Sequence, residues 1–173
     1  MRAMVWFFAA VALSSVSAAW AQSQPTIRKV EHAIHGGHLT SGSGMALYLF
    51  EEDRREGERG RAAESDCVGD CLGRWPPFIV TDGKPEAGEG VDASLIGVFV
   101  RDDGRRQATY NGWPLYFFAE DFVAGDTNGH NLDDSGGEWY LLTVSGWGAG
   151  VPADKEEGGR QQNGHGGGHG DDQ

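Results

Sequence analysis

A ten-residue segment occurs twice in this chain and limits what the chain can fold into. Residues 44–53 and residues 112–121 align without a gap, and six of the ten positions are identical. Both copies contain the motif Tyr-x-Phe-x-x-Asp. The motif residues are Tyr48, Phe50, Asp53, Tyr116, Phe118 and Asp121. Because self-similarity within one chain reflects a repeated structural unit, the sequence predicts two related halves.

The spacing within the motif indicates what its residues do. Tyr and Phe are two residues apart, so they lie on the same face of a strand. The Asp follows three residues after Phe, where the strand would end, and its carboxylate can there accept turn amides or a hydroxyl from the other half. A catalytic centre rarely needs two copies of every residue, whereas a pseudo-symmetric core does. We therefore interpret the motif as structural or binding rather than catalytic.

The strand patterns predict an all-β protein. Residues 45–50 are apolar on both faces, which is typical of a strand covered on both sides in a sandwich or small barrel. Residues 94–101 give the clearest strand, followed by an Asp-Asp-Gly hairpin turn and a return strand at 105–110. Asn111-Gly112 predicts a second, type I′ turn, which needs positive φ at both central positions. We expect two pseudo-symmetric repeats of antiparallel strands and hairpins in one small sandwich or barrel.

The chain divides into five expected segments. Residues 1–21 have a positive start, a short apolar run and small residues before Gln22, as in a secretory signal peptide. Residues 22–38 form an N-terminal segment, 39–90 the first repeat and 91–148 the second, whose final strand at 138–144 carries Trp139 as the match of Trp75. Residues 149–173 form a Gly/His-rich tail that we expect to be disordered.

Export and charge restrict the partners. The apolar run is too short to span a bilayer, which takes about 20 residues, so no stable membrane insertion is expected after signal cleavage. A net charge of −12 argues against nucleic acid, because no basic stripe is present to neutralise phosphates. The sequence predicts a periplasmic or secreted protein whose partner is an unidentified envelope ligand or protein.

The two cysteines leave two hypotheses. In an exported protein Cys67 and Cys71 most simply form a disulfide. Closing so short a loop stabilises by only about 2 kcal/mol, so the bond would fix a local turn rather than hold the fold together. Alternatively, free thiolates suit Cu(I), and together with six histidines they would make this a periplasmic copper-binding protein.

Three other candidate metal sites have weaker support in the sequence. His32, His35 and His38 are spaced by three, but a Gly-Gly pair breaks any helix there, so we favour solvated or hydrogen-bonded histidines over a metal site. Residues 126–131 resemble the start of a calcium loop without its final Glu, and we favour a plain glycine-rich loop. His165 and His169 in the tail are candidates for incidental metal binding. No metal site and no cofactor are predicted.

Several uncommon motifs occur together in one order. They are the two Tyr-x-Phe-x-x-Asp copies, Cys-x-x-x-Cys before Trp-Pro-Pro, and the run of residues 103–116. With these the chain resembles, over about residues 39–144, the bacterial secreted-repeat family, also described as predicted lipoproteins with a Tyr-x-(Phe/Trp/Tyr)-x-x-Asp motif. The resemblance implies a cell-envelope protein with tandem repeats, for which no biochemical function is established. No cysteine lies near the expected cleavage site, so a lipid anchor is not expected.

Three classes of function remain. We favour a non-enzymatic envelope protein, either a binding or a structural module, with periplasmic copper binding as the alternative. A carboxylate-based hydrolase would use Asp53 and Asp121 as a pair. The sequence contains no Gly-x-Ser-x-Gly, no His-Glu-x-x-His and no phosphate loop. We therefore predict that the protein is not an enzyme.

Overall fold

The computed structural model describes residues 25–150, which form short strands with very little helix. The strands are β1 (Thr26–His32), β2 (Gly36–Ser41), β3 (Tyr48–Phe50), β4 (Glu86–Ala87), β5 (Ile96–Val100), β6 (Arg106–Tyr110), β7 (Trp113–Pro114), β8 (Leu132–Asp134) and β9 (Gly137–Leu141). The helical turns are η1 (Glu58–Gly60), α1 (Cys71–Arg74) and η2 (Ala93–Leu95). The predicted signal peptide and most of the tail, including His165 and His169, lie outside the described residues.

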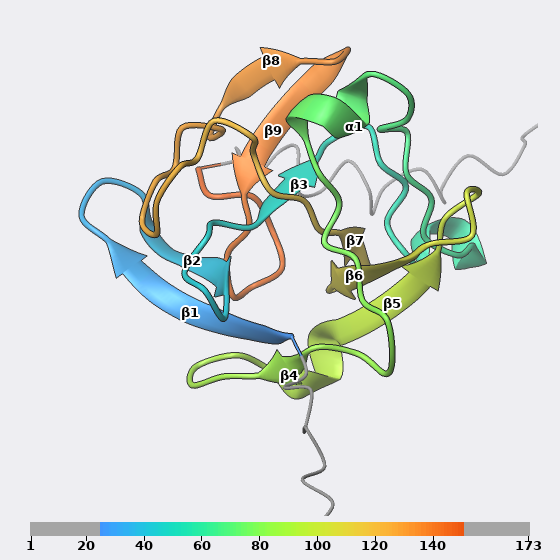
Figure 1. The fold of residues 1–173 in the computed structure, drawn as a ribbon. Coiled ribbons are helices and arrows are strands. Elements are labelled where there is room, and N and C mark those ends of the chain that lie inside the picture. Colours follow the sequence, from blue (N-terminus) through green and yellow to red (C-terminus); the bar gives the residue numbers. More distant parts are fainter. Residues whose placement is uncertain (1–24, 151–173) are drawn as a thin grey trace, which may run out of the picture.

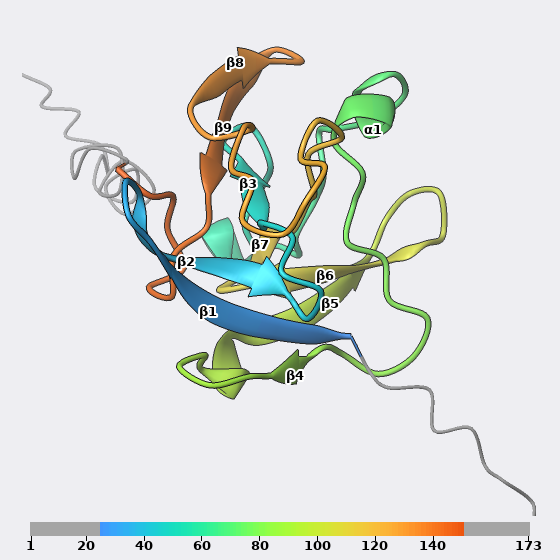
Figure 2. The same cartoon turned by 60° about the vertical axis from the view of Figure 1, so that its left-hand side comes forward.

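The strands form three sheets of three strands each, in the orders β2-β1-β4, β3-β9-β8 and β5-β6-β7. Neighbouring strands are antiparallel except for β1 and β4, which are parallel. The prediction of an all-β fold with two repeats is confirmed. Within residues 25–150 the strands stay in three small sheets and do not close into a barrel. Figures 1 and 2 show β3 and β7 near the centre of the molecule.

The hairpins of the second half follow the turn chemistry of the sequence. Strand β5 pairs with β6 across the turn that contains Gly104, and β6 pairs with β7 across Asn111-Gly112. Asn111 has φ 48° and Gly112 has φ 82°, as the type I′ turn requires. A side chain on Gly112 would also lie 2.8 Å from the backbone oxygen of Glu56, so both the conformation and the space favour glycine.

The first half begins with a matching hairpin. Strand β1 pairs along its length with β2, from Ile27 opposite Ser41 to His32 opposite Gly36. It therefore holds the same position in the first half that β5 holds in the second. The segment 22–38, which the sequence set apart from the first repeat, contributes this strand to the repeat's hairpin (Figure 1).

Each repeat places its tryptophan-containing segment against the other repeat. Strand β9 of the second repeat pairs with β3 of the first, and the Leu142 N–H donates to the Leu47 carbonyl at 2.9 Å. In the reverse direction, the Phe78 N–H of the first repeat donates to the Leu115 carbonyl of the second at 2.8 Å. The two repeats thus exchange strands, and each of the two buried hydrophobic clusters contains residues from both repeats.

The same hydrogen bonds show that the two tryptophans are equivalent. Trp75 lies three residues before Phe78, and Trp139 lies three residues before Leu142. Both indoles are fully buried and stack on each other with ring centres 3.8 Å apart and planes within 2°. The pseudo-symmetry axis therefore passes between them.

The described residues contain no helix that is long and apolar enough to cross a membrane.

Candidate functional site

The tyrosine of each motif copy donates a hydrogen bond to the aspartate of the other copy. The Tyr48 hydroxyl lies 2.7 Å from Asp121 Oδ2, and the Tyr116 hydroxyl lies 2.6 Å from Asp53 Oδ2. Between them the two tyrosines exchange backbone hydrogen bonds of 2.9 and 3.0 Å, the reciprocal pattern of an antiparallel bridge. We call Tyr48–Asp121 and Tyr116–Asp53 the crossed pairs.

The second oxygen of each aspartate accepts a backbone amide. The Asp66 N–H donates to Asp53 Oδ1, and the Asn128 N–H donates to Asp121 Oδ1, both at 2.8 Å. Each carboxylate therefore closes a loop after its own motif and at the same time bonds the tyrosine of the other repeat. These are the two kinds of partner that the motif spacing suggested for the aspartates.

Four aromatic rings stack across the pseudo-symmetry axis beside the crossed pairs. Phe50 stacks on Trp139 at 4.3 Å, Trp139 on Trp75, and Trp75 packs on Phe118 at 4.4 Å between ring centres. The Trp75 indole N–H donates to Asp134 Oδ2 at 2.8 Å, so its polar atom is satisfied. The phenylalanines of the motif are thus the two ends of one shared aromatic stack.

Burial shifts the titration of the crossed pairs. It raises the pKa of Asp53 to about 7, although the hydrogen bonds from Tyr116 and from the Asp66 amide favour the ionised form. The pKa of Asp121 is also raised by burial. Burial and the adjacent carboxylates raise the pKa of both tyrosines, so their hydroxyls stay protonated donors.

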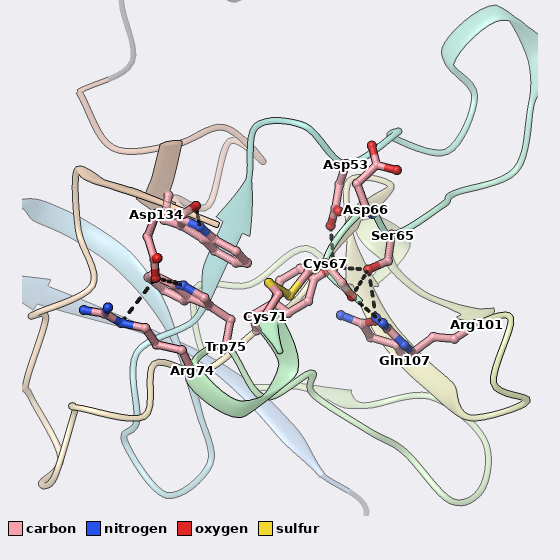
Figure 3. Close-up of a disulfide and its surroundings, with 12 residues drawn as sticks. Asp53, Ser65, Asp66, Cys67, Cys71, Arg74, Trp75, Arg101, Gln107 and Asp134 are labelled. Atoms are coloured by element: carbon pink, nitrogen blue, oxygen red, sulfur yellow. Dashed lines mark hydrogen bonds and ion pairs between the residues drawn. A yellow bond between two sulfur atoms is a disulfide. The ribbon is translucent and has the colours of Figure 1, made fainter. Parts of the chain in front are cut away.

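Among residues 25–150, a buried cation lies beside the Tyr116–Asp53 pair and none lies beside the Tyr48–Asp121 pair. The Tyr116 hydroxyl is 2.6 Å from Ser65 Oγ, which accepts a hydrogen bond from Arg101 Nη1 at 2.9 Å. Arg101 is only 5% exposed; its Nη2 donates to the Cys67 carbonyl at 2.7 Å and its Nη1 to the Gln107 side-chain oxygen. Figure 3 shows this guanidinium among Ser65, Cys67 and Gln107.

A surface cavity of about 420 Å³ opens next to Arg101. Its apolar lining is Val68, Leu72, Phe99 and Val100, and its charged lining is Arg54, Glu64, Arg101, Asp102 and Asp103. Two of the lining side chains, Val68 and Val100, are more than half exposed. The cavity is a place where an external molecule could contact the end of the second hairpin.

Cys67 and Cys71 are joined by a disulfide with Cα atoms 5.4 Å apart (Figure 3). The bond spans the turn before α1 and Trp75. It occupies both thiols, so neither is free to act as a thiolate ligand. The copper hypothesis loses its sulfur ligands in this state of the protein.

The carboxylates of the glycine-rich loop point to separate partners. Asp126 Oδ2 accepts the backbone amides of Phe122 and Val123, whereas Asp134 accepts the Trp75 indole and an ion pair from Arg74 at 3.2 Å. Residues 25–150 contain no group of three His, Cys, Asp or Glu side chains that could hold a metal ion.

The histidines of the first hairpin meet a fourth histidine from the second repeat. The rings of His32 and His35 are 5.0 Å apart, those of His32 and His38 are 5.9 Å apart, and those of His35 and His130 are 4.5 Å apart. Burial lowers the pKa of His35, of His38 and, to about 4, of His130. We call these four residues the imidazole cluster.

A family model described as a secreted repeat of unknown function matches residues 32–79 and 97–143. The chain belongs to this family. The two matched stretches contain both Tyr-x-Phe-x-x-Asp copies and both stacked tryptophans, so in this secreted-repeat protein the family pattern coincides with the exchanged core. Comparison with curated proteins and with solved structures found no significant match.

Sequence reasoning on this secreted-repeat protein missed the residues around the core. Ser65 and Arg101 belong to no motif, Gln107 and His130 were given no role of their own within theirs, and each of the four acquires its neighbours only in the folded chain. A charged residue directly after a strand, such as Arg101, is usually exposed, so its burial had no local signal. His130 stands in a loop 92 residues after His38, and only tertiary structure brings it near the first hairpin.

Proposed function

We propose that this protein is a non-enzymatic module of the bacterial cell envelope in which the repeated motif holds two exchanged repeats together. The observation that supports this most is the crossing of the pairs. Every polar motif atom bonds the other repeat or a nearby backbone amide, so both copies are explained by the stability of the fold.

The geometry of the aspartates argues against hydrolysis. A glycosidase needs two carboxyl groups that flank one scissile bond and can reach the substrate. Asp53 and Asp121 are 3% and 7% exposed, and each carboxylate accepts a tyrosine hydroxyl on one oxygen and an amide on the other. Neither is placed to exchange a proton with an external sugar.

The proposed location is the periplasm or the exterior of the cell. The family is described as secreted, and the first 21 residues have the pattern of a signal peptide. A disulfide between nearby cysteines suits the same compartments, because cytosolic thiols are kept reduced.

Any binding role would use surfaces that differ between the repeats. The exchanged core is nearly the same on both sides of the pseudo-symmetry axis, whereas the cavity beside Arg101 is lined by residues 54–72 of the first repeat and by residues 99–103 at the end of the second hairpin. An envelope ligand or protein would therefore recognise one hairpin end and not the shared motif.

Replacing the motif aspartates tests the proposal. Asp53→Asn and Asp121→Asn should each lower the melting temperature, because each weakens one crossed pair. The exposed Asp82→Asn should leave it unchanged. Circular dichroism gives the melting curves, and a panel of chromogenic glycosides reports hydrolysis. If either motif variant melted like the wild type and lost a hydrolytic activity that the wild type has, the proposal would be wrong.

A further inference from the structure

The strand exchange makes the two hairpins comparable residue by residue. The Leu39 carbonyl accepts the Leu47 N–H, and the Ala108 carbonyl accepts the Leu115 N–H, both at 3.0 Å. Leu39 and Ala108 are therefore equivalent positions in hairpins β1–β2 and β5–β6. The outer strand of the first hairpin, β1, thus corresponds to the outer strand of the second, β5.

The pairing within each hairpin extends the equivalence to single residues of the outer strands. Lys29 lies opposite Leu39, and Val98 lies opposite Ala108. Lys29 of β1 is therefore equivalent to Val98 of β5. Two residues farther along, the same register makes the last exposed residue before His32 equivalent to the last residue of β5.

In the first hairpin another part of the chain protects the outer edge of β1. Strand β4 pairs in parallel with the start of β1, and the Gly88 N–H donates to the Ile27 carbonyl at 2.8 Å. Farther along, Lys29 and Glu31 form an ion pair at 2.6 Å. Charged side chains on an edge discourage pairing with other chains. The edge is thus closed by a strand at one end and by charges beyond it.

The outer edge of β5 has neither kind of protection. Strand β5 is the last strand of its sheet, and no strand within residues 25–150 pairs with its outer side (Figures 1 and 2). Val98 and Val100 stand where Lys29 and Glu31 stand in β1, and Val100 is 65% exposed. The second hairpin therefore presents an open and apolar strand edge.

The backbone groups on this edge can accept a further strand. The Arg101 N–H donates to the Arg105 carbonyl across the hairpin. Because successive residues of an antiparallel strand turn their N–H and C=O groups to alternate sides, Val98 and Val100 direct theirs away from β6. Neither of these N–H groups has a hydrogen-bond partner among residues 25–150. Such a row of unpaired groups is a template for strand pairing.

The edge is complementary to a second copy of itself. In an antiparallel pair centred on Val98, this residue faces Val98 of the second copy, and Ile96 faces Val100. Strand β5, Ile96–Val100, carries no charged residue, so no like charges meet along the pair. Val and Ile are favoured in strands because they pack well against their cross-strand neighbours.

Charges beyond the strand fit the same pairing. Lys84 Nζ donates to the carbonyls of Ala93 and Ile96, both at 3.1 Å, so its ammonium group lies beside Ser94. The register of the pair brings the exposed Asp102 of the second copy toward Ser94, and hence toward this ammonium group. The Ile96 carbonyl has a second lone pair for the added strand. Each end of the pair thus brings a lysine of one copy near an aspartate of the other.

We propose that this protein forms a two-fold symmetric dimer in which the β5 edges of two copies pair antiparallel. The dimer joins two sheets into one, in the order β7-β6-β5-β5-β6-β7. Each copy receives on β5 a strand from outside, where β1 receives β4 from its own chain. Two-fold dimers are the commonest oligomers, and this pairing uses both edges, so assembly stops at two copies.

Sedimentation velocity measures the association. We would use residues 22–173, which lack the predicted signal peptide, with EDTA present so that metal ions cannot link the tail histidines of two chains. Because so small an interface binds weakly, the concentration series should reach about 500 µM. The weight-average mass should rise from one chain to two and stop there. A mass of one chain throughout, or a mass that rises beyond two chains, would overturn the proposal.

Hydrogen exchange followed by NMR locates the contact. The amides of Val98 and Val100 should exchange more slowly at high protein concentration than at low, because the second copy accepts their hydrogen bonds. The amides of Lys29 and Glu31, at the equivalent positions of the first hairpin, are matched controls and should not change. Dimers without slower exchange at Val98 and Val100 would place the contact elsewhere and overturn the proposal.

Two variants test the edge, each against a matched control. Val100→Lys and Asp102→Lys each bring a new lysine near Lys84 of the second copy. Each should raise the Kd of the dimer at least about ten-fold, because like charges across an interface repel. Val123→Lys and Asp133→Lys make the same changes at exposed residues outside β5 and should leave the Kd unchanged.

Circular dichroism checks that all four variants fold. An unchanged Kd in Val100→Lys, which alters the edge itself, would overturn the proposal.

Discussion

The two crossed pairs have the same hydrogen bonds but different surroundings. In both, a tyrosine hydroxyl donates to an aspartate of the other repeat within 0.1 Å of the same distance. The Tyr116 hydroxyl also contacts Ser65, which leads to Arg101 and the cavity. The Tyr48 hydroxyl instead accepts only a long hydrogen bond of 3.3 Å from the Gly129 amide.

The ends of the two hairpins differ in chemistry even more than the surroundings of the two crossed pairs do. The β5–β6 hairpin ends at the buried Arg101 guanidinium, which bonds the carbonyl of the disulfide-linked Cys67 of the first repeat, and the β1–β2 hairpin carries His32, His35 and His38 of the imidazole cluster. Residues at the pseudo-symmetry axis are thus alike in the two repeats, while residues farther out differ in chemistry. The comparison supports our proposal that the shared centre serves folding and that any specific binding would use the ends.

The largest expected effect comes from the stacked tryptophans. Trp75→Ala and Trp139→Ala should each lower the free energy of unfolding by about 3–5 kcal/mol, because each removes a fully buried indole from the centre of the stack. Urea unfolding followed by circular dichroism measures both. Similar losses would support the equivalence of the two positions, and a loss in only one would contradict it.

The crossed pairs should differ in strength. Tyr116→Phe and Tyr48→Phe should each cost about 1–3 kcal/mol, because each leaves a buried carboxylate without its hydroxyl partner. The cost should be greater for Tyr116→Phe, since its hydroxyl contacts both Asp53 and Ser65. The same urea assay measures both variants, and a greater cost for Tyr48→Phe would count against the comparison.

A smaller expected effect is the pH dependence of the free energy of unfolding. Asp53 has a folded-state pKa of about 7 against an ordinary value of 3.8, so the folded protein holds this proton more tightly than the unfolded chain. Its contribution to stability is complete below about pH 4 and is lost as the pH rises through 7. Asp53→Asn should therefore reduce the loss of unfolding free energy between pH 5 and pH 8. Equal losses in variant and wild type would show that Asp53 is already ionised at pH 5.

Local features of the sequence predicted local structure. Asn111-Gly112 specified its turn because few residues adopt positive φ at both positions. The two-residue spacing of Tyr48 and Phe50 placed both in one buried cluster, and the position of Asp53 after the strand placed its carboxylate at a turn amide. These predictions depended on a few residues near one another in the chain.

The exchange of strands between the two repeats could not be predicted from local features of the sequence. Both repeats carry the same motif, so a tyrosine paired within its own repeat and one paired with the other repeat have the same sequence pattern. The burial of Arg101 and the arrival of His130 beside the first hairpin depend on which repeat each segment packs against. That choice is made by the whole core, in which Trp75 and Trp139 meet across the axis.

A double-mutant cycle tests the exchange most directly. Tyr116→Phe is combined once with Asp53→Asn, its partner in the other repeat, and once with Asp121→Asn, which follows it in the same repeat. The coupling energy from urea unfolding should be about 0.5–3 kcal/mol for the first combination and within about 0.5 kcal/mol of zero for the second. Strong coupling between Tyr116 and Asp121, with none between Tyr116 and Asp53, would show that each repeat folds on itself and would contradict the crossed pairs.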